Sequence, residues 1–318
     1  MKKEEMDPVL NDFLKKTTVS NNINDFPVGA FFVNLSKMHL PLVNWHWHEE
    51  VEFIIINNGQ ANIQFSDESI LLSPGEGIFV NQNSLHSIQG IGNDECSFYT
   101  LKFQPTFLFG YYQTYLASQY LSPVLSSPKL HYLFMKEEDK TTCELLNLVN
   151  DTLAYMLFKR FGYELKVKSL LCDIWFHLLQ LTKSPERETN PLSQRAASDS
   201  KRIKQAMLYI EEHHMEQLTL DEIANSIHIS KSECCRCFQR SLGLTPFEYL
   251  LKFRIFESTR KMIGDDKELV SIASLASSVG FNSVSYYNKL FKKYMNCTPT
   301  EYRKNLKNAL EKKPEASL

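Results

Sequence analysis

The pattern of apolar and polar positions divides the chain into a β-rich first part and a helical remainder. Between residues 28 and 103, short runs rich in Val, Ile and Phe are separated by Asn-Gly, Ser-Asp and Pro-Gly turns, which is typical of strands. Successive short strands of this kind predict a barrel or sandwich. The runs are Ala30–Leu35, Val51–Asn57, Ala61–Phe65, Gly77–Asn81 and Ser97–Phe103.

After Pro105 the apolar positions recur at helical spacing. Two stripes stand out: Leu145, Leu148, Val149, Thr152, Leu153 and Met156, then Val167, Leu170, Leu171, Ile174, Leu178 and Leu181. Two long amphipathic helices after a small barrel could cover it or pair with a second subunit, and the pattern leaves both open. Residues 183–200 are polar, contain prolines and are expected to form a linker. The pattern therefore predicts domains at 1–182 and 201–308, with a tail at 309–318.

A repeat marks the helical part of the chain. Thr245-Pro246-Phe247-Glu248-Tyr249 recurs as Thr298-Pro299-Thr300-Glu301-Tyr302, an offset of 53 residues. The apolar pattern of residues 220–227 also recurs at 272–279. Self-similarity at a fixed period of this length predicts a repeated supersecondary unit.

Each copy has the pattern of two helices joined by a short turn. Thr219 and Glu222 fit a capping box, Ser230 can cap a helix to Ser241, and Asn282-Ser283 can cap one to Lys293. The first turn contains His228 where positive φ is expected, and the second contains Gly280. A helix-turn-helix unit places its second helix in the major groove of DNA. The segment between the copies, residues 246–263, is expected to form one rigid helix.

Helical spacing sorts the residues of the two second helices into core and surface. Phe238, Tyr287 and Phe291 are expected in the core. Arg236 and Lys289 are the predicted base contacts, while Lys231, Arg240, Lys292 and Lys293 suit phosphates. The predicted DNA-binding set is Ser232, Cys235, Arg236, Gln239, Arg240, Ser283, Val284, Ser285, Tyr286, Asn288, Lys289 and Lys293.

The distribution of charge fits this interpretation, although the net charge of −2 does not. Residues 199–318 carry 19 basic and 15 acidic side chains, so the excess of acid lies in the rest of the chain. The N-terminus leads into no apolar stretch, and the apolar runs are too short to span a bilayer. Seven cysteines without disulfide-like spacing favour reduced thiols in a cytoplasm.

Residues 201–307 resemble the DNA-binding domain of the AraC family of bacterial transcription regulators. The resemblance is carried by the segment from Gly280 to Lys293 (GFNSVSYYNKLFKK) and by Thr298-Pro299, Glu301, Tyr302 and Arg303. Cys234, Ser258 and Asn296 depart from the family pattern. The resemblance implies a cytoplasmic, non-enzymatic regulator that binds promoter DNA, takes a small effector, forms a homodimer and contacts RNA polymerase.

The first part contains a second pattern, H-x-H-x3-E-x6-G with Pro74-Gly75 and a later His86, which resembles a cupin barrel. On a strand, His46 and His48 share a face. Two interpretations remain open: a metal site of His46, His48, Glu52 and His86, as in cupin enzymes, or a polar pocket for an organic effector. The second is adopted, with no metal and no cofactor, and the expected effector-binding residues are Trp45, His46, His48, Glu52 and His86.

The fold class expected is therefore α+β, a cupin-like β-barrel with trailing helices followed by an all-α domain with two helix-turn-helix units. The function expected is an activator of transcription that responds to a sugar or a related metabolite. Alternatives are a metal-dependent cupin enzyme with an accessory DNA-binding domain, and a regulator without a small-molecule effector. The cluster Cys234-Cys235-x-Cys237 lacks the second ligand pair of a zinc module, so small packing residues are favoured.

Overall fold

The computed structural model describes residues 26–37, 42–66, 68–92, 95–110, 114–127, 130–183, 194–263 and 270–304. The chain divides into two compact units, residues 1–195 and 196–318. The predicted tail at 309–318 and most of the predicted linker lie outside the described residues.

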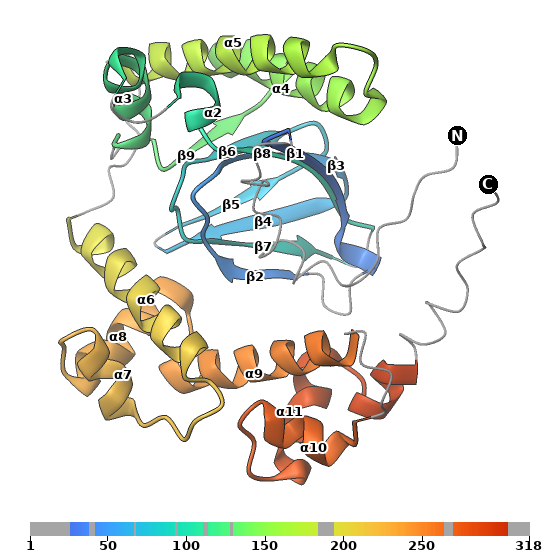
Figure 1. Cartoon of the computed structure of the whole chain (residues 1–318), viewed down its shortest axis with the longest axis vertical. Helices are drawn as coiled ribbons and strands as arrows, with labels where there is room; N and C mark the ends of the chain where they lie inside the picture. The colour runs from blue at the N-terminus through green and yellow to red at the C-terminus, as the bar shows by residue number, and fades with distance from the viewer. Residues whose placement is uncertain are drawn as a thin grey trace. The chain divides into compact units, whose positions relative to one another are not determined.

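The first unit contains two antiparallel sheets that face each other (Figure 1). In the five-stranded sheet the order is β1 (Val28–Asn34), β8 (Ser97–Phe103), β3 (Val51–Asn58), β6 (Gly77–Val80) and β9 (Tyr132–Met135). In the four-stranded sheet it is β2 (Leu42–His46), β7 (His86–Ile91), β4 (Gln60–Phe65) and β5 (Ser69–Leu72). The five predicted strands are confirmed, and the structure adds β2, β5, β7 and β9.

Alternation along the strands builds two apolar layers from the five-stranded sheet. Ile54 and Ile56 of β3 pack between the sheets with residues such as Ile63 and Phe98. The intervening residue Phe53 packs on the opposite face, in the layer that the helices cover. Strand β3 is therefore buried on both faces, which explains its uninterrupted apolar run.

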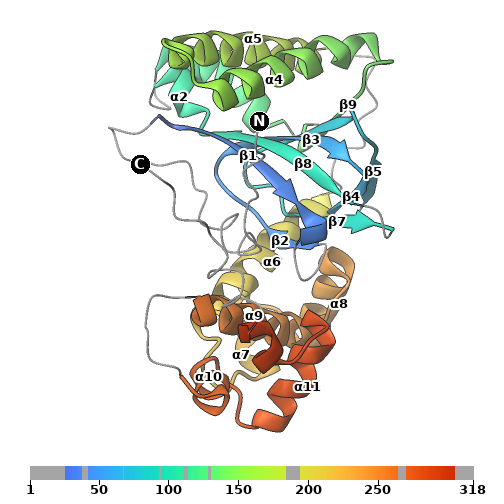
Figure 2. The ribbon, with the colours of Figure 1, turned by 90° about the vertical axis from the view of Figure 1, so that its right-hand side faces the viewer.

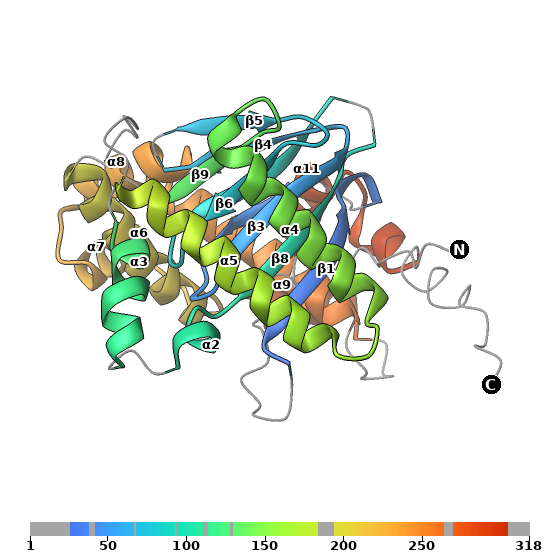
Figure 3. The same cartoon turned by 90° about the horizontal axis from the view of Figure 1, so that it is seen from above.

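The helices α4 (Lys140–Phe158) and α5 (Tyr163–Lys183) lie side by side across the outer face of the five-stranded sheet (Figures 2 and 3). The Asp139 side chain caps α4 by accepting from the Thr141 N–H. The predicted stripe of α4 is buried in the same unit, with Leu145 and Val149 fully inaccessible. Of the two possibilities left open, the helices cover their own barrel.

The segment expected to be helical throughout contains other elements. The short helices α2 (Thr106–Phe109), η2 (Ala117–Leu121, a π-helix) and α3 (Ser122–Leu125) precede strand β9. Outside that segment, the residues that follow β1 form the 3-10 turn η1 (Leu35–Lys37). β9 is a strand because it alternates buried Leu133 and Met135 with less buried neighbours and pairs with the edge of β6.

The second unit is helical. α6 (Gln194–Glu212) is followed by α7 (Leu220–Ser226), α8 (Lys231–Leu242), α9 (Pro246–Ile263), α10 (Ile272–Ser278) and α11 (Val284–Met295). Figure 1 shows α9 running between the α7–α8 pair and the α10–α11 pair. α6 begins at Gln194, inside the residues expected to be linker, and buries Ile203, Met207 and Ile210 in this unit.

Candidate nucleic-acid interface and barrel cluster

Side-chain caps start each helix-turn-helix unit where the sequence predicted. Thr219 and Glu222 form a capping box at α7, and Ser230 and Ser283 accept backbone N–H groups at the starts of α8 and α11. His228 has φ 55° and Gly280 has φ 88°, so both turns use the left-handed conformation. These local features fix the directions of α8 and α11.

The repeated Thr-Pro-x-Glu-Tyr motif does the same structural task in both copies. The Thr245 N–H donates to Glu248 Oε2 at 2.8 Å, and the Thr298 N–H donates to Glu301 Oε2 at 2.7 Å. The tyrosine that ends each motif is buried. Tyr249 lies 6.3 Å from Phe238 and Tyr302 lies 5.6 Å from Phe291, measured between ring centroids. The motif therefore caps one helix and supports the buried face of α8 or α11.

A buried arginine joins the two helix-turn-helix units. Arg254 of α9 donates from Nε to the His214 carbonyl and from Nη2 to the Glu216 carbonyl, each at 2.6 Å. Its guanidinium lies 5.8 Å from the ring centroid of Phe281, in the turn between α10 and α11 of the second helix-turn-helix unit. Because the Arg254 side chain contacts both the turn before α7 and the turn before α11, it fixes the position of one helix-turn-helix unit relative to the other.

The structure places the predicted DNA-binding side chains on the surface of α8 and α11. All are exposed except Cys235, which is half-buried, and the predicted core residues Phe238, Tyr287 and Phe291 are fully buried. Sequence spacing thus separated surface from core on both helices. Contact of this surface with DNA remains a prediction.

The helices α8 and α11 differ in whether their basic side chains form ion pairs with nearby carboxylates. On α8, Arg236 Nη2 lies 2.8 Å from Glu233 Oε2, and Arg240 Nη2 lies 2.7 Å from Asp199 Oδ2 and 2.8 Å from Glu233 Oε1. Hydrogen bonds from Arg240 and Arg236 lower the pKa of Glu233. α11 contains Lys289, Lys292 and Lys293 and no acidic residue. The pairing by Glu233 and Asp199 was not anticipated from sequence, because it depends on the packing of α6 against α8.

The thiols of α8 do not form a reactive pair. Burial raises the pKa of Cys234 to about 11 and that of Cys237 to about 12, so both stay protonated at neutral pH. They pack as small apolar side chains.

In the barrel, the cross-strand register brings the predicted histidines together. β2 ends at His46, which pairs with His86 of β7 after a register shift in β2. Their ring centroids are 4.2 Å apart, and His48 lies 5.5 Å from His86. The ligand atoms of His46, His48, Glu52 and His86 all lie within 4.8 Å of one another. The predicted convergence of these four residues is therefore present.

Glu52 is the charged centre of this cluster. It is fully buried, accepts from Thr100 Oγ1 at Oε1 (2.6 Å), and lies 3.2 Å from Lys102 Nζ. Burial raises the pKa of Glu52, but the charge of Lys102 and the neighbouring imidazoles of His48 and His86 outweigh it and hold that pKa well below its usual value. Burial lowers the pKa of His46 well below its usual value. Sequence analysis missed Thr100 and Lys102, although a lysine inside an apolar strand was a visible signal.

The two tryptophans of this region differ in exposure. Trp45 is buried in β2 and Trp47 is half-buried just after it. A role for Trp45 in effector binding remains a prediction.

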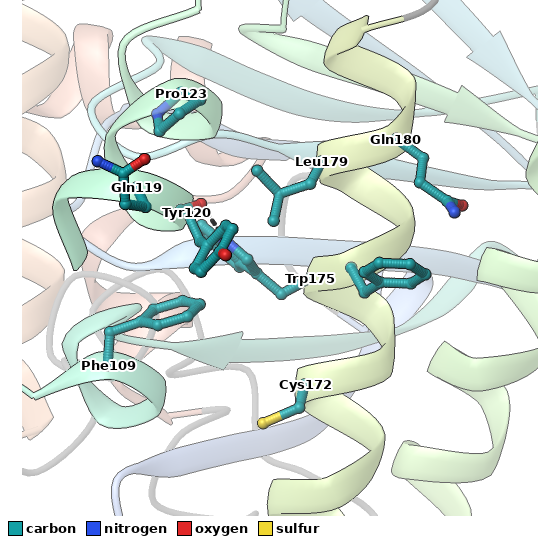
Figure 4. A pocket seen from close by; sticks show the side chains of 9 residues that line it. Phe109, Gln119, Tyr120, Pro123, Cys172, Trp175, Leu179 and Gln180 are labelled. Atoms are coloured by element: carbon teal, nitrogen blue, oxygen red, sulfur yellow. Dashed lines mark hydrogen bonds between the residues drawn. The ribbon is translucent and has the colours of Figure 1, made fainter. Parts of the chain in front are cut away.

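A separate apolar groove lies along α5 (Figure 4). It has a volume of about 410 Å³. Trp175 Nε1 donates to the Tyr120 carbonyl at 2.8 Å and joins α5 to η2 at the groove. The lining residues are Phe109, Gln119, Tyr120, Pro123, Cys172, Trp175, Phe176, Leu179 and Gln180.

No helix in the described part of the chain is both long and apolar enough to cross a membrane.

Comparison with known proteins gives two family matches that agree with this geometry. Residues 38–170 match the AraC-like ligand binding domain, and residues 223–305 match a helix-turn-helix domain. The uncharacterized HTH-type transcriptional regulator YdeC of Bacillus subtilis (strain 168) is 30% identical over 296 residues, 93% of this chain and 98% of that protein.

Two further similarities span most of the chain. The melibiose operon regulatory protein of Escherichia coli (strain K12) is 24% identical, over 81% of this chain and 83% of that protein. A solved structure of ToxT from Vibrio cholerae is 15% identical with a TM-score of 0.46, covering 87% of this chain and 98% of that one. Because both family models match and a transcriptional regulator is 30% identical over 93% of the chain, the chain belongs to the AraC family of transcription regulators.

Proposed function

We propose that the protein activates transcription by binding promoter DNA through α8 and α11, in response to a small effector in the barrel. The observation that supports DNA binding is that α8 and α11 are both exposed and that Arg254 fixes their two helix-turn-helix units relative to each other. Duplex DNA presents its major groove on one side about every 34 Å, so two rigidly joined units can read adjacent grooves.

The effector proposed is a sugar or a related metabolite. Support comes from the polar cluster inside the barrel and from a relative, similar over 81% of this chain, that is named for the melibiose operon. Trp45, His46, His48, Glu52 and His86 are the residues proposed to meet it.

A homodimer and contact with RNA polymerase complete the proposal. The buried stripe of α4 cannot supply the dimer surface, because it packs on its own sheet. The outer sides of α4 and α5 instead expose Leu157, Phe158, Leu165 and Phe176, which supports association there. Sedimentation of the full chain gives the oligomeric state, and a monomer at micromolar concentration would count against the dimer.

The test of the function is selection of random duplex DNA by the full-length protein. Two short motifs about one helical turn apart should be enriched, which is about 10–10.5 base pairs between centres. Binding that is weak, falls steeply with salt and enriches no sequence would contradict a sequence-specific regulator.

Arg236 tests direct readout on the selected site. Arg236→Ala should reduce the preference for the selected sequence over random DNA by about 1–3 kcal/mol, the range for one arginine–guanine contact. Competition binding at one salt concentration measures this preference. Equal losses on selected and random DNA would show that Arg236 contacts only phosphate.

A further inference from the structure

The orientation of the three barrel histidines determines which ring nitrogen carries the proton. His46 Nδ1 lies 2.8 Å from the Asn44 carbonyl, His86 Nδ1 lies 2.9 Å from the Ser84 carbonyl, and His48 Nδ1 lies 2.9 Å from the Glu50 carbonyl. A carbonyl oxygen can only accept, so each Nδ1 donates to it. In a neutral imidazole the other nitrogen, Nε2, then presents a lone pair.

These lone pairs converge on a carboxylate oxygen, which is also an acceptor. Glu52 Oε2 lies 2.9 Å from His48 Nε2 and 3.3 Å from His86 Nε2. The Nε2 atoms of His46 and His86 are buried and have no hydrogen-bond partner among the described residues. Buried acceptors that face one another without a donor are costly, and a cation between them removes that cost.

Lys102 does not supply this cation. Its Nζ lies near Oε1 of Glu52, the oxygen that also accepts from Thr100, and it makes no hydrogen bond to the imidazoles within the described residues. Thr100 and Lys102 therefore hold the carboxylate by one oxygen and leave Oε2 turned toward the three Nε2 atoms.

The dimensions of the cluster suit a metal ion. Four ligand atoms about 2.1 Å from one ion lie between about 3.0 and 4.2 Å apart. The four ligand atoms here lie within 4.8 Å of one another, so shifts of less than about 1 Å bring them to a common centre. Backbone carbonyls that accept from each Nδ1 are the usual support of metal-bound histidine.

We propose that His46 Nε2, His48 Nε2, His86 Nε2 and Glu52 Oε2 bind one divalent first-row transition-metal ion, such as Zn²⁺, Mn²⁺ or Ni²⁺. Imidazole and carboxylate ligands without a thiolate match this class of ion. The proposal adds a metal ion to the polar pocket that these residues form in the proposed function, and it differs in this from the sequence prediction of a pocket without metal. Metal binding itself does not depend on the proposed function. Only its consequence, that the ion forms part of the effector site, rests on that proposal.

The experiment uses the full-length protein, stripped with a chelator and re-equilibrated with Zn²⁺, Mn²⁺ or Ni²⁺ separately. Elemental analysis after removal of free ion gives the stoichiometry, and calorimetry gives the affinity. One ion per chain is expected for at least one metal. His48→Ala, at the least buried of the three histidines, should weaken binding by at least about 100-fold, because the loss of a ligand exceeds the 10–100-fold typical of a supporting residue.

Two further variants separate metal binding from folding. Thr100→Val keeps all four ligands and should weaken binding by about 10–100-fold, because Glu52 loses its hydrogen bond. His177→Ala removes a histidine of the same unit that pairs with Glu144 on the helical surface, and should leave binding unchanged. Thermal melting of each stripped variant shows whether it is folded.

Less than about a tenth of an ion per chain with all three metals would overturn the proposal, as would equal affinity in the parent, His48→Ala and Thr100→Val proteins. Binding to the selected DNA, measured with and without the ion, tests the proposed function separately. Stoichiometric metal with unchanged DNA binding would keep the metal site and remove its part in regulation. Specific DNA binding without any metal uptake would keep the regulator and remove the site.

Discussion

Glu233 controls how much positive charge α8 presents at its surface. Its two carboxylate oxygens pair with Arg236 and Arg240, both of which belong to the predicted DNA-binding set. Glu233→Gln should tighten binding to random DNA a few-fold and steepen the dependence of log K on log salt by about 0.9, the value for one more phosphate contact. A salt titration of DNA binding measures both effects.

The helix cap is preserved in this variant, because Ser230 accepts from the backbone N–H of residue 233 and not from its side chain. Glu222→Gln, at a carboxylate that caps α7, is the matched control and should leave the salt slope unchanged. An unchanged slope in Glu233→Gln would mean that Arg236 and Arg240 already reach phosphate in the parent protein.

Ser258 occupies a position where the family pattern favours alanine, and the structure gives it a partner. The Tyr287 hydroxyl donates to Ser258 Oγ at 3.0 Å, and Ser258 Oγ donates to the Ile255 carbonyl. Both side chains are fully buried. Ser258→Ala should lower the free energy of unfolding by about 1–3 kcal/mol, because the buried tyrosine hydroxyl loses its partner.

A double-mutant cycle with Tyr287→Phe, followed by denaturant unfolding, isolates this interaction. Tyr287→Phe should cost less in the Ser258→Ala protein than in the parent, because the unpaired hydroxyl is removed with it. Strictly additive losses would mean that the two side chains do not interact.

The two inter-helix turns form a natural comparison, since they have the same conformation and different residues. Gly280 has φ 88°, and a Cβ there would lie 2.6 Å from the His214 carbonyl oxygen. Gly280→Ala should therefore destabilise the second helix-turn-helix unit by at least about 2 kcal/mol, because the left-handed strain of alanine adds to a backbone clash. His228→Gly should change stability by less than about 1 kcal/mol, because relief of strain offsets the greater freedom of glycine in the unfolded chain.

Denaturant unfolding of the two variants measures this difference. If Gly280→Ala were as stable as the parent, the close approach of residues 214 and 280 would be wrong. The bridge that Arg254 makes between the two helix-turn-helix units would then be wrong too.

Strands were predicted well in one sheet and poorly in the other, for a physical reason. Four of the five predicted strands lie in the five-stranded sheet, which is covered on both faces and therefore reads as apolar runs. The four-stranded sheet exposes one face, so β7 carries Gln89 among buried residues, and β5 is only four residues long. Such strands are recognised by their partners rather than by their own composition.

The site shows the same limit. The convergence of His46, His48, Glu52 and His86 was predicted from alternation and a motif, because those residues are close in sequence or part of one pattern. Lys102 meets Glu52 only because β3 and β8 pair in that register. Pairing of distant strands is a property of the folded chain, and no local pattern contains it.

The boundary between the two units can be tested on the molecule as a whole. Sequence composition placed the start of the helical domain at residue 201, whereas α6 begins at Gln194. Asp199 lies in the intervening turns, is buried, and holds Arg240 of α8 through two hydrogen bonds. A fragment of residues 194–318 should therefore be more stable than one of residues 201–318.

The loss expected for the shorter fragment from this pair is about 1–2 kcal/mol, less than the 3–5 kcal/mol for a fully buried pair, because Arg240 remains 34% exposed and keeps Glu233. Thermal melting of both fragments measures it, at roughly 3–6 °C per kcal/mol for a chain of this size. Asp199→Asn in the longer fragment should reproduce most of the decrease. Equal melting temperatures for all three would show that the helical domain begins where composition placed it, at residue 201, and that the first turns of α6 contribute nothing to the position of α8.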